Sequence, residues 1–256
     1  MRVGLFGFGR AGKAVASVLL RSRDTQLCWV MRKSKNFQYK SVSEFLGVSS
    51  DDPGLIFSKS EWTAAGLFEH HPVDVVIDFS SANSIGFYGN EAAGRNVAIV
   101  SAVSEYPPKI LKRIQALASK TRVLWSPNIT IGVNFLMLAA RVLRNIAPYS
   151  DVEIIEEHFK DKPGISGTAK RIATFLEMDE ASIKTIRAGG IVGCHEILFG
   201  FPFQTVRLKH ESISREAFGN GALFAAKSIL KVKNGLYSME DILLPYFKVR
   251  TLKSCS

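Results

Sequence analysis

A histidine, two lysines and a Gly-Ser-Thr cluster lie close together in the segment IIEEHFKDKPGISGTAK, near the middle of the chain. His158 ends an expected strand at 151–158, and histidine is the side chain best able to donate a proton near neutral pH. Lys160 and Lys162 follow at the same parity and continue that face if the chain stays extended. Ammonium groups beside an acid favour a bound carboxylate, so the segment predicts an anion site with His158 in reach.

A helix is expected to begin directly after this segment. Ser166, Gly167 and Thr168 stand at its start, where Ser and Thr cap helices and backbone N–H groups are left without helical partners. The positive end of the helix favours the same carboxylate that the lysines would attract. The competing interpretation is a structural histidine in an ordinary strand–turn–helix connection.

A glycine-rich turn near the N-terminus predicts a dinucleotide site. It follows a short apolar strand and opens a helix, with the spacing G-x-G-x-x-G. In this pattern the first glycine permits the tight turn, the second lets a pyrophosphate approach the backbone, and the third allows close helix–strand packing. The predicted cofactor-binding residues are Gly7, Phe8, Gly9, Arg10, Ala11 and Gly12.

The end of the second strand indicates which dinucleotide is bound. NAD-binding folds usually carry an acid there, which holds the ribose 2′-hydroxyl. Here Arg32, Lys33 and Ser34 follow the strand, and Arg10 in the turn could add a third positive charge. These residues favour NADPH, with NADH as the other possible cofactor, against the alternative of exposed basic residues without a ligand.

The elements that must position these residues alternate along the chain. Near-continuous apolar strands are expected near the N-terminus, including Val3, Leu5 and Phe6, and at 26–31, 73–79, 96–101 and 122–125, with helices such as 108–119 between them. This alternation indicates a parallel sheet covered on both faces. After residue 127 the pattern changes to a long amphipathic helix at 132–146, a strand at 151–158, a helix at 169–178 and strand-like runs within 183–213. The predicted fold class is α/β, with a Rossmann-type domain followed by an α+β domain.

Composition limits the partners and the compartment. A net charge of +10 fits nucleic acid or small anions, but the basic residues are scattered without a Lys/Arg run, which disfavours nucleic acid. The three cysteines lie far apart with no CxxC spacing, so we expect no disulfide framework, no metal site and a cytoplasmic protein. No apolar run reaches the roughly 20 residues of a membrane span.

Several segments together resemble one enzyme family, the 4-hydroxy-tetrahydrodipicolinate (dihydrodipicolinate) reductases. The resemblance extends over nearly the whole chain and lies in the order expected for that family. The matching segments are Gly9-Arg10-Ala11-Gly12, Asp78-Phe79-Ser80, Ser126-Pro127-Asn128 with Gly132-Val133-Asn134, EIIEEH at 153–158 with Lys162 and Ser166-Gly167-Thr168-Ala169, Arg187-Ala188-Gly189 with Ile191-Val192-Gly193 and His195, Phe218 with Gly221-Ala222, and Gly235-Leu236-Tyr237.

The resemblance implies a reaction and a role for each matching residue. The family reduces 4-hydroxy-tetrahydrodipicolinate with NAD(P)H on the diaminopimelate–lysine pathway and forms homotetramers through its central domain. It implies catalysis by His158 and Lys162, and substrate binding at Phe159, Ser166, Gly167 and Thr168. Further cofactor contacts are implied at Ser101, Ala102, Val103, Ser126, Pro127, Asn128 and Ile129. The implied domains are 1–127 with 233–256 for the dinucleotide and 128–232 for substrate and assembly.

Three departures from the family pattern keep other functions open. Phe159 replaces a second histidine, the loop Pro163-Gly164-Ile165 is one residue short, and Ser101-Ala102-Val103-Ser104 replaces GTTG. The first alternative is a reductase of the same architecture that acts on another anionic imine or keto acid. The second is a weakly catalytic homologue that binds nucleotide in a regulatory role, which the retained pair His158 and Lys162 disfavours.

Overall fold

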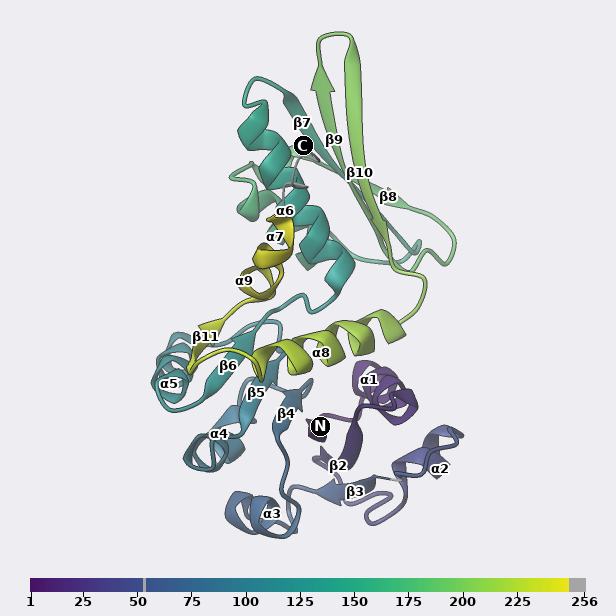
Figure 1. The fold of residues 1–256 in the computed structure, drawn as a ribbon. Coiled ribbons are helices and arrows are strands. Elements are labelled where there is room, and N and C mark those ends of the chain that lie inside the picture. Colours follow the sequence, from purple (N-terminus) through teal and green to yellow (C-terminus); the bar gives the residue numbers. More distant parts are fainter. Residues whose placement is uncertain (53, 249–256) are drawn as a thin grey trace, which may run out of the picture. The chain divides into compact units, whose positions relative to one another are not determined.

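The computed structural model describes residues 1–52 and 54–248, and the chain divides into two compact units. The first unit contains Met1–Thr130 and Arg215–Ile242, and the second contains Ile131–Ser214 and, of the described C-terminal residues, 243–248. Each unit is built on a sheet of its own, as Figure 1 shows.

The first unit contains a seven-stranded sheet in the order β11-β6-β5-β4-β1-β2-β3, in which every neighbouring pair is parallel. The central strands are almost wholly buried, which is why their sequences are near-continuous apolar runs. The strands are β1 (Arg2–Phe6), β2 (Gln26–Arg32), β3 (Leu55–Ser58), β4 (Val75–Asp78), β5 (Ala98–Ser101), β6 (Arg122–Trp125) and β11 (Gly235–Tyr237).

Helices cover both faces of this sheet (Figure 1), which confirms the predicted Rossmann-type architecture. On one face the helices α3, α4 and α5 share an apolar cluster with Phe6, Trp29 and Val76. On the other, α1 packs against α8, which also contacts β4, β5 and β6. The helices are α1 (Arg10–Arg21), α2 (Val42–Leu46), α3 (Ala64–His70), α4 (Ile85–Gly94), α5 (Pro108–Ala118), α8 (Glu216–Ile229) and α9 (Met239–Leu243), the last of which ends where the second unit resumes.

The turn between β1 and α1 requires glycine at two positions. Gly7 has a φ of +96°, and a Cβ there would lie 2.7 Å from the carbonyl carbon and oxygen of Phe79. At Gly12 a Cβ would lie 2.1 Å from the carbonyl oxygen of Gly7. Because no other residue fits either position without moving backbone, the predicted tight turn is a steric requirement of this fold.

The second unit contains a four-stranded mixed sheet in the order β10-β9-β7-β8. β7 pairs parallel to β8, and β9 pairs antiparallel to both β7 and β10. Residues of α6 and α7 join the sheet in one apolar core that includes Met137, Ile154 and Ile172. The elements are α6 (Ile131–Ile146), β7 (Asp151–His158), α7 (Gly167–Phe175), η1 (Glu180–Ser182), β8 (Ile183–Arg187), β9 (Cys194–Phe201), β10 (Gln204–Glu211) and η2 (Leu244–Phe247).

The boundaries of the compact units differ from the predicted domain boundaries. The range 128–232 was expected to form the second domain, but α8 belongs to the first unit. Small residues make this packing close: a Cβ on Gly219 would lie 2.6 Å from Val18, and one on Gly221 would lie 1.9 Å from the carbonyl oxygen of Ile129. Of the predicted returning tail, β11 pairs with β6, and residues 249–256 lie outside the described part.

Among the described residues, none of the helices combines the length and the apolar character needed to cross a membrane.

Candidate active site

A cavity of about 720 Å³ opens at the glycine turn of the first unit. Three of the predicted turn residues line it, together with both predicted cations at the end of β2. A Cβ on Gly9 would meet no atom within 4 Å, so the turn leaves room for a phosphate to approach the backbone. The lining residues are Phe6, Gly7, Phe8, Gly9, Met31, Arg32, Lys33, Ser34, Lys59, Phe79, Ser80, Ser81, Asn83 and Ser84.

The cations near this cavity are held against aromatic rings. The guanidinium carbon of Arg32 lies 5.5 Å from the ring centroid of Phe37, and its Nη1 donates a 3.1 Å hydrogen bond to the carbonyl oxygen of Asn36. Lys13 lies over the ring of Phe45 at 4.7 Å, and the rings of Phe45 and Phe37 are 4.9 Å apart. Positive charge is therefore concentrated beside the turn, as a 2′-phosphate would require.

Other predicted cofactor residues lie at the carboxyl ends of the neighbouring strands, but several of their side chains turn into the protein. The hydroxyl of Ser101 is 2.6 Å from that of Tyr106, and Ser101 is wholly buried. Ser126 donates a 2.6 Å hydrogen bond to the carbonyl oxygen of Asn128, and Ile129 is buried. Ten of the predicted cofactor residues are not among those lining the cavity: Arg10, Ala11 and Gly12 of the turn, and Ser101, Ala102, Val103, Ser126, Pro127, Asn128 and Ile129.

Asp78 at the end of β4 is a buried carboxylate beneath this edge. Its Oδ2 accepts a 2.8 Å hydrogen bond from the hydroxyl of Tyr88, and its Oδ1 accepts one of 2.8 Å from the backbone of Ser80. Burial raises the pKa of Asp78 to about 6, although these hydrogen bonds oppose the rise. Asp78 therefore anchors the Ser80 turn that lines the cavity.

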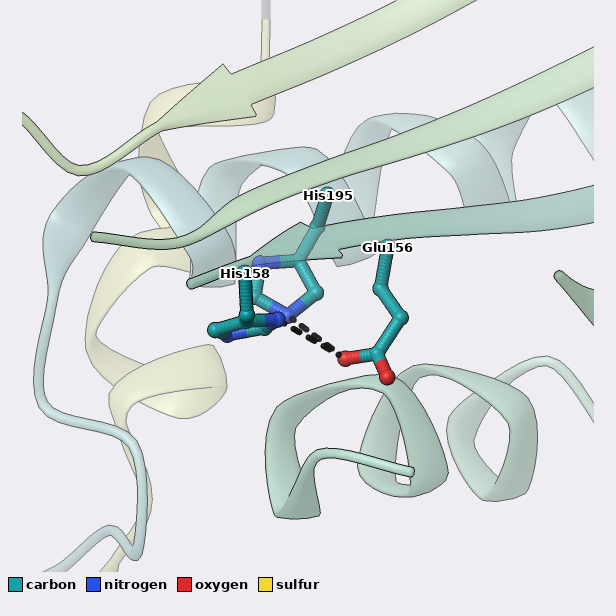
Figure 2. A group of neighbouring side chains, drawn as sticks. All are labelled: Glu156, His158 and His195. Atoms are coloured by element: carbon teal, nitrogen blue, oxygen red, sulfur yellow. Dashed lines mark ion pairs between the residues drawn. The ribbon is translucent and has the colours of Figure 1, made fainter. Parts of the chain in front are cut away.

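In the second unit, β7 and β9 bring together the side chains that Figure 2 shows. Glu156 and His158 come from β7, and His195 comes from β9, where it lies opposite Glu156 in the antiparallel register. His158 is 6% exposed, and a Cβ on Gly193 would lie 3.1 Å from its Nε2. The backbone of Gly193 thus lies against the imidazole edge, where a larger residue would press on the ring.

Glu156 connects the parts of this site. Its Oε1 accepts a 2.7 Å hydrogen bond from Nη2 of Arg187, and both its oxygens lie within 3.2 Å of the backbone nitrogen of Ser166. Its Oε2 is 3.2 Å from Nδ1 of His158. The carboxylate therefore joins the start of α7, the end of β8 and the candidate acid.

The start of α7 is formed as the sequence predicts. The Oγ of Ser166 accepts a 3.0 Å hydrogen bond from the backbone N–H of Ala169, so Ser166 is the N-cap. Its Oγ also lies 3.2 Å from Nε2 of His195. Gly167 is exposed, and a Cβ there would meet nothing within 4 Å, so a ligand can reach the helix terminus. Thr168 follows it in the first turn.

The pKa values of these groups differ from their ordinary values. Burial lowers the pKa of His158, although the carboxylate of Glu156 opposes the change. Burial and then the neighbouring His158 lower the pKa of His195 to about 3. For Glu156, burial alone would raise the pKa, but the hydrogen bonds from Arg187 and Ser166 outweigh it and lower the pKa. At neutral pH both imidazoles are neutral and Glu156 is charged.

The segment after β7 does not stay extended, so the expected continuation of the strand face is wrong. The backbone N–H of Lys162 donates a 3.1 Å hydrogen bond to the carbonyl oxygen of Phe159, closing a turn that interrupts the alternation. Lys162 still lies near enough to His158 to lower the pKa of its imidazole. Phe159 is 43% exposed at this turn.

The one-residue-short loop is tied to β8. The Nε of Arg187 donates a 3.1 Å hydrogen bond to the carbonyl oxygen of Lys162, and its Nη2 donates to that of Gly164. Arg187 therefore holds this loop and Glu156 at once.

The ligand atoms of Glu156, His158 and His195 all lie within 4.8 Å of one another, a spacing that could hold a metal ion. The carboxylate already accepts hydrogen bonds from Arg187 and from Ser166. The positive charge of the Arg187 guanidinium beside it disfavours the binding of a metal cation. The arrangement is better suited to positioning a proton donor beside an anion.

Sequence reasoning missed four residues of these sites. Glu156 shares the parity of His158 and lies in the matching motif at 153–158, and Arg187 and His195 also appeared as parts of a matching motif, but no role was assigned to any of the three. Lys59 lines the dinucleotide cavity from the end of β3 and gave no local signal.

Comparisons with known proteins identify the family. The model of the dihydrodipicolinate reductase N-terminus matches residues 1–129, and that of the dihydrodipicolinate reductase C-terminus matches residues 129–243. A 4-hydroxy-tetrahydrodipicolinate reductase of Syntrophus aciditrophicus is 30% identical, covering 93% of this chain and 96% of that protein. One of Thermosipho africanus is 33% identical, covering 82% of this chain and 96% of that protein.

A solved structure shares the fold. The dipicolinate-bound dihydrodipicolinate reductase of Paenisporosarcina sp. TG-14 has a TM-score of 0.78 at 23% identity, covering 95% of this chain and 99% of that one. An amine dehydrogenase of Mycobacterium smegmatis has a TM-score of 0.65 at 11% identity, covering 94% of this chain and 95% of that one, which shows a wider occurrence of the architecture. From the two family models and the curated relatives, this chain belongs to the dihydrodipicolinate reductase family, a family of nicotinamide-dependent reductases.

Proposed function

We propose that this protein reduces 4-hydroxy-tetrahydrodipicolinate to tetrahydrodipicolinate, in the synthesis of diaminopimelate and lysine, with NADPH as reductant. The observation that carries the proposal is the position of His158, a buried imidazole between Glu156 and the Gly193 backbone. The cofactor is assigned to the first unit and the dicarboxylate to the second.

The chemistry of His158 follows from its surroundings. In the free protein the lowered pKa keeps this imidazole neutral. Two substrate carboxylates would favour its charged form, because opposite charge nearby raises the pKa of a histidine. His158 would thus take up a proton as the dianion binds and donate it to the substrate as hydride arrives. The reduced nicotinamide supplies that hydride when bound.

The same dianion accounts for the remaining polar groups. Lys162 offers an ammonium group near His158, and the start of α7 offers the hydroxyl of Ser166 and backbone donors at Gly167 and Thr168. A helix N-terminus favours negative charge, so a carboxylate placed there is held by the helix as well as by the cation.

The preference for NADPH over NADH rests on Arg32 and Lys33, which line the cavity at the end of β2. Lys59 adds a third cation to the same lining. No carboxylate is among the cavity-lining residues of the described chain, so a ribose 2′-hydroxyl lacks the acid that NAD sites usually provide.

Assembly into a cytoplasmic homotetramer is a further part of this proposal. In the second unit, α6 and α7 cover one face of the sheet, while Lys184, Ile186 and Arg207 are exposed on its strands. A tetramer would cover such a face, and light scattering of the purified protein would give the mass of the assembly. A monomeric mass would contradict this part alone.

Phe159 favours a second candidate function, in which the same chemistry acts on another anionic imine or keto acid. Phe159, the residue after His158, is 43% exposed and would offer a substrate an apolar surface where the family has a histidine. Such a substrate would carry an apolar group in place of one hydrogen-bond acceptor.

The test is the oxidation of NADPH with substrate made in the assay from pyruvate and aspartate semialdehyde by the preceding synthase. We expect enzyme-dependent loss of NADPH absorbance. His158→Ala should lower kcat by about 10²–10⁴-fold with little change in NADPH affinity, because a general acid is lost. NADPH binding without turnover by the unmodified protein would exclude this substrate, and near-normal turnover of the variant would exclude His158 as the acid.

A further inference from the structure

His195 is a buried histidine of the second unit to which neither the proposed reaction nor the cofactor assigns a role. It is 5% exposed on β9, between Glu156 of β7 and His210 of β10 in the register of the sheet. Figure 2 shows its ring beside that of His158, and the ring centroids are 5.3 Å apart. It cannot serve as an acid near neutral pH, because burial holds the pKa of its imidazole at about 3. Its role must come from its neutral form.

A neutral imidazole carries one proton, and the surroundings decide on which nitrogen. Nε2 lies 3.2 Å from the Oγ of Ser166 and 4.0 Å from Oε2 of the charged Glu156. Nδ1 is buried, with no hydrogen-bond partner among the described residues. A proton on Nδ1 would be a buried donor without an acceptor, whereas a proton on Nε2 has an acceptor and faces a carboxylate. The Nε2–H tautomer is therefore favoured.

This tautomer determines what the hydroxyl of Ser166 can do. Its oxygen already accepts the backbone N–H of Ala169 as the N-cap of α7. If it also accepts the N–H of His195, both lone pairs are used and the hydroxyl proton must be donated elsewhere. With the opposite tautomer, Ser166 would donate its proton to His195 and would have no donor to offer.

We propose that His195 is a positioning residue that directs the Ser166 hydroxyl proton toward a substrate carboxylate at the N-terminus of α7. This rests on the proposed function, because it takes the ligand to be a dicarboxylate. The open space at Gly167, where a Cβ would meet nothing within 4 Å, is where that carboxylate can lie. His195 acts only through Ser166 and affects the binding of substrate more than the proton transfer from His158.

Two substitutions separate this role from simple packing. In His195→Gln the amide nitrogen can reach the position of Nε2 and donate to Ser166, whereas in His195→Asn it reaches only about as far as Nδ1. Dipicolinate, a stable dicarboxylate, serves as the probe in calorimetric titration. We expect His195→Asn to weaken its binding by about 10-fold or more, as for one lost hydrogen bond to a charged group. His195→Gln should restore most of that loss.

Kinetics and a double mutant provide the further readouts. His195→Asn should raise KM with little change in kcat, and its penalty should vanish in a Ser166→Ala background, because the residue acts through that hydroxyl. Equal dipicolinate affinities of the Gln and Asn variants, or additive losses in the double mutant, would overturn the proposal for His195.

Nitrogen NMR of the unmodified protein, labelled at histidine, decides the tautomer without any substitution. We expect His195 to carry its proton on Nε2, and a proton on Nδ1 would overturn the inference even if both variants failed to fold. Failure of the unmodified protein to bind dipicolinate would instead count against the proposed function itself.

Discussion

At the scale of single residues, one carboxylate organises the candidate active site. Glu156 is wholly buried, and it faces a guanidinium, the start of a helix and an imidazole at once. A buried charge is tolerated only when it is paired and hydrogen-bonded, and Arg187 and Ser166 satisfy that condition. The free-energy cost of burying the Glu156 carboxylate is therefore offset by Arg187 and Ser166. The same carboxylate also acts on the pKa of His158.

The pH dependence of catalysis should report this influence. An acid must be protonated to act, so activity through His158 is lost as the pH rises through its pKa. Burial lowers that pKa and Glu156 opposes the lowering, so Glu156→Gln should lower it further. The high-pH fall of kcat/KM should then begin at lower pH in the variant, which a pH–rate profile measures.

Glu153→Gln is the matched control, because Glu153 lies on the same strand and pairs with Lys184 at 3.4 Å instead. An unchanged profile in Glu156→Gln, or an equal shift in both variants, would contradict the influence of Glu156 on His158.

Arg32 should determine the choice of cofactor. Arg32→Ala removes a guanidinium that can form charge-assisted hydrogen bonds to a 2′-phosphate. We expect NADPH binding to weaken by about 10-fold or more, with NADH binding little changed. Lys40→Ala is the control, because Lys40 lies 5.8 Å from the ring of Phe37 but is not among the cavity-lining residues. Equal losses for both dinucleotides would place the 2′-phosphate elsewhere.

At the scale of elements, the β1–α1 turn has two glycines with different physical roles. Position 12 must be glycine for steric reasons, because a Cβ there would lie 2.1 Å from the carbonyl oxygen of Gly7. Gly9 has room for a Cβ and an ordinary backbone conformation, with φ −81° and ψ −164°. Gly12 is therefore required for the folded backbone, whereas Gly9 leaves space for a bound ligand.

Two alanine substitutions should separate these roles. Gly12→Ala should lower the free energy of unfolding by about 1–3 kcal/mol or more, because backbone atoms must move. Gly9→Ala should leave unfolding nearly unchanged and weaken NADPH, because the new methyl group occupies the space that the pyrophosphate needs. Urea unfolding and NADPH fluorescence titration measure the two effects. An equal loss of unfolding free energy in both variants, or full NADPH affinity in Gly9→Ala, would contradict the separate roles of the two glycines.

At the scale of the whole molecule, the net charge of +10 fits the small anions of the proposed function. The cations form local groups, with Arg32, Lys33 and Lys59 at one cavity and Lys162 and Arg187 near His158. A dinucleotide phosphate and a dicarboxylate are both anionic, and a positive field raises their local concentration.

Ionic strength should distinguish this explanation from nucleic-acid binding. NADPH affinity should fall by less than about tenfold between 50 and 200 mM salt, because few phosphate contacts are involved. A protein that tracks a nucleic-acid backbone loses about 10³–10⁵ in affinity over the same range. Tight duplex DNA binding with that steep dependence would contradict the small-anion explanation.

Local patterns allowed the dinucleotide turn, the strand at β7 and the cap at Ser166 to be predicted from the sequence. Each depends on residues within one turn or one strand, where steric limits on glycine, alternation of side chains and capping by serine act over short distances. The family could be recognised for a related reason, since its motifs follow one another in order along the chain. Asp151–His158 was predicted with the bounds that the structure has.

Only the tertiary structure decided which side chains meet. His195 reaches Ser166 because β9 pairs with β7 in a register that sets it opposite Glu156, and nothing in the spacing of these residues indicates that register. Lys59 lines the cavity because β3 lies beside β2. The same holds for α8, whose glycines allow it to pack in the first unit. The periodicity of apolar residues in the sequence indicates which face of an element is buried. Which element lies next to that face is decided by packing between segments that are distant in the sequence.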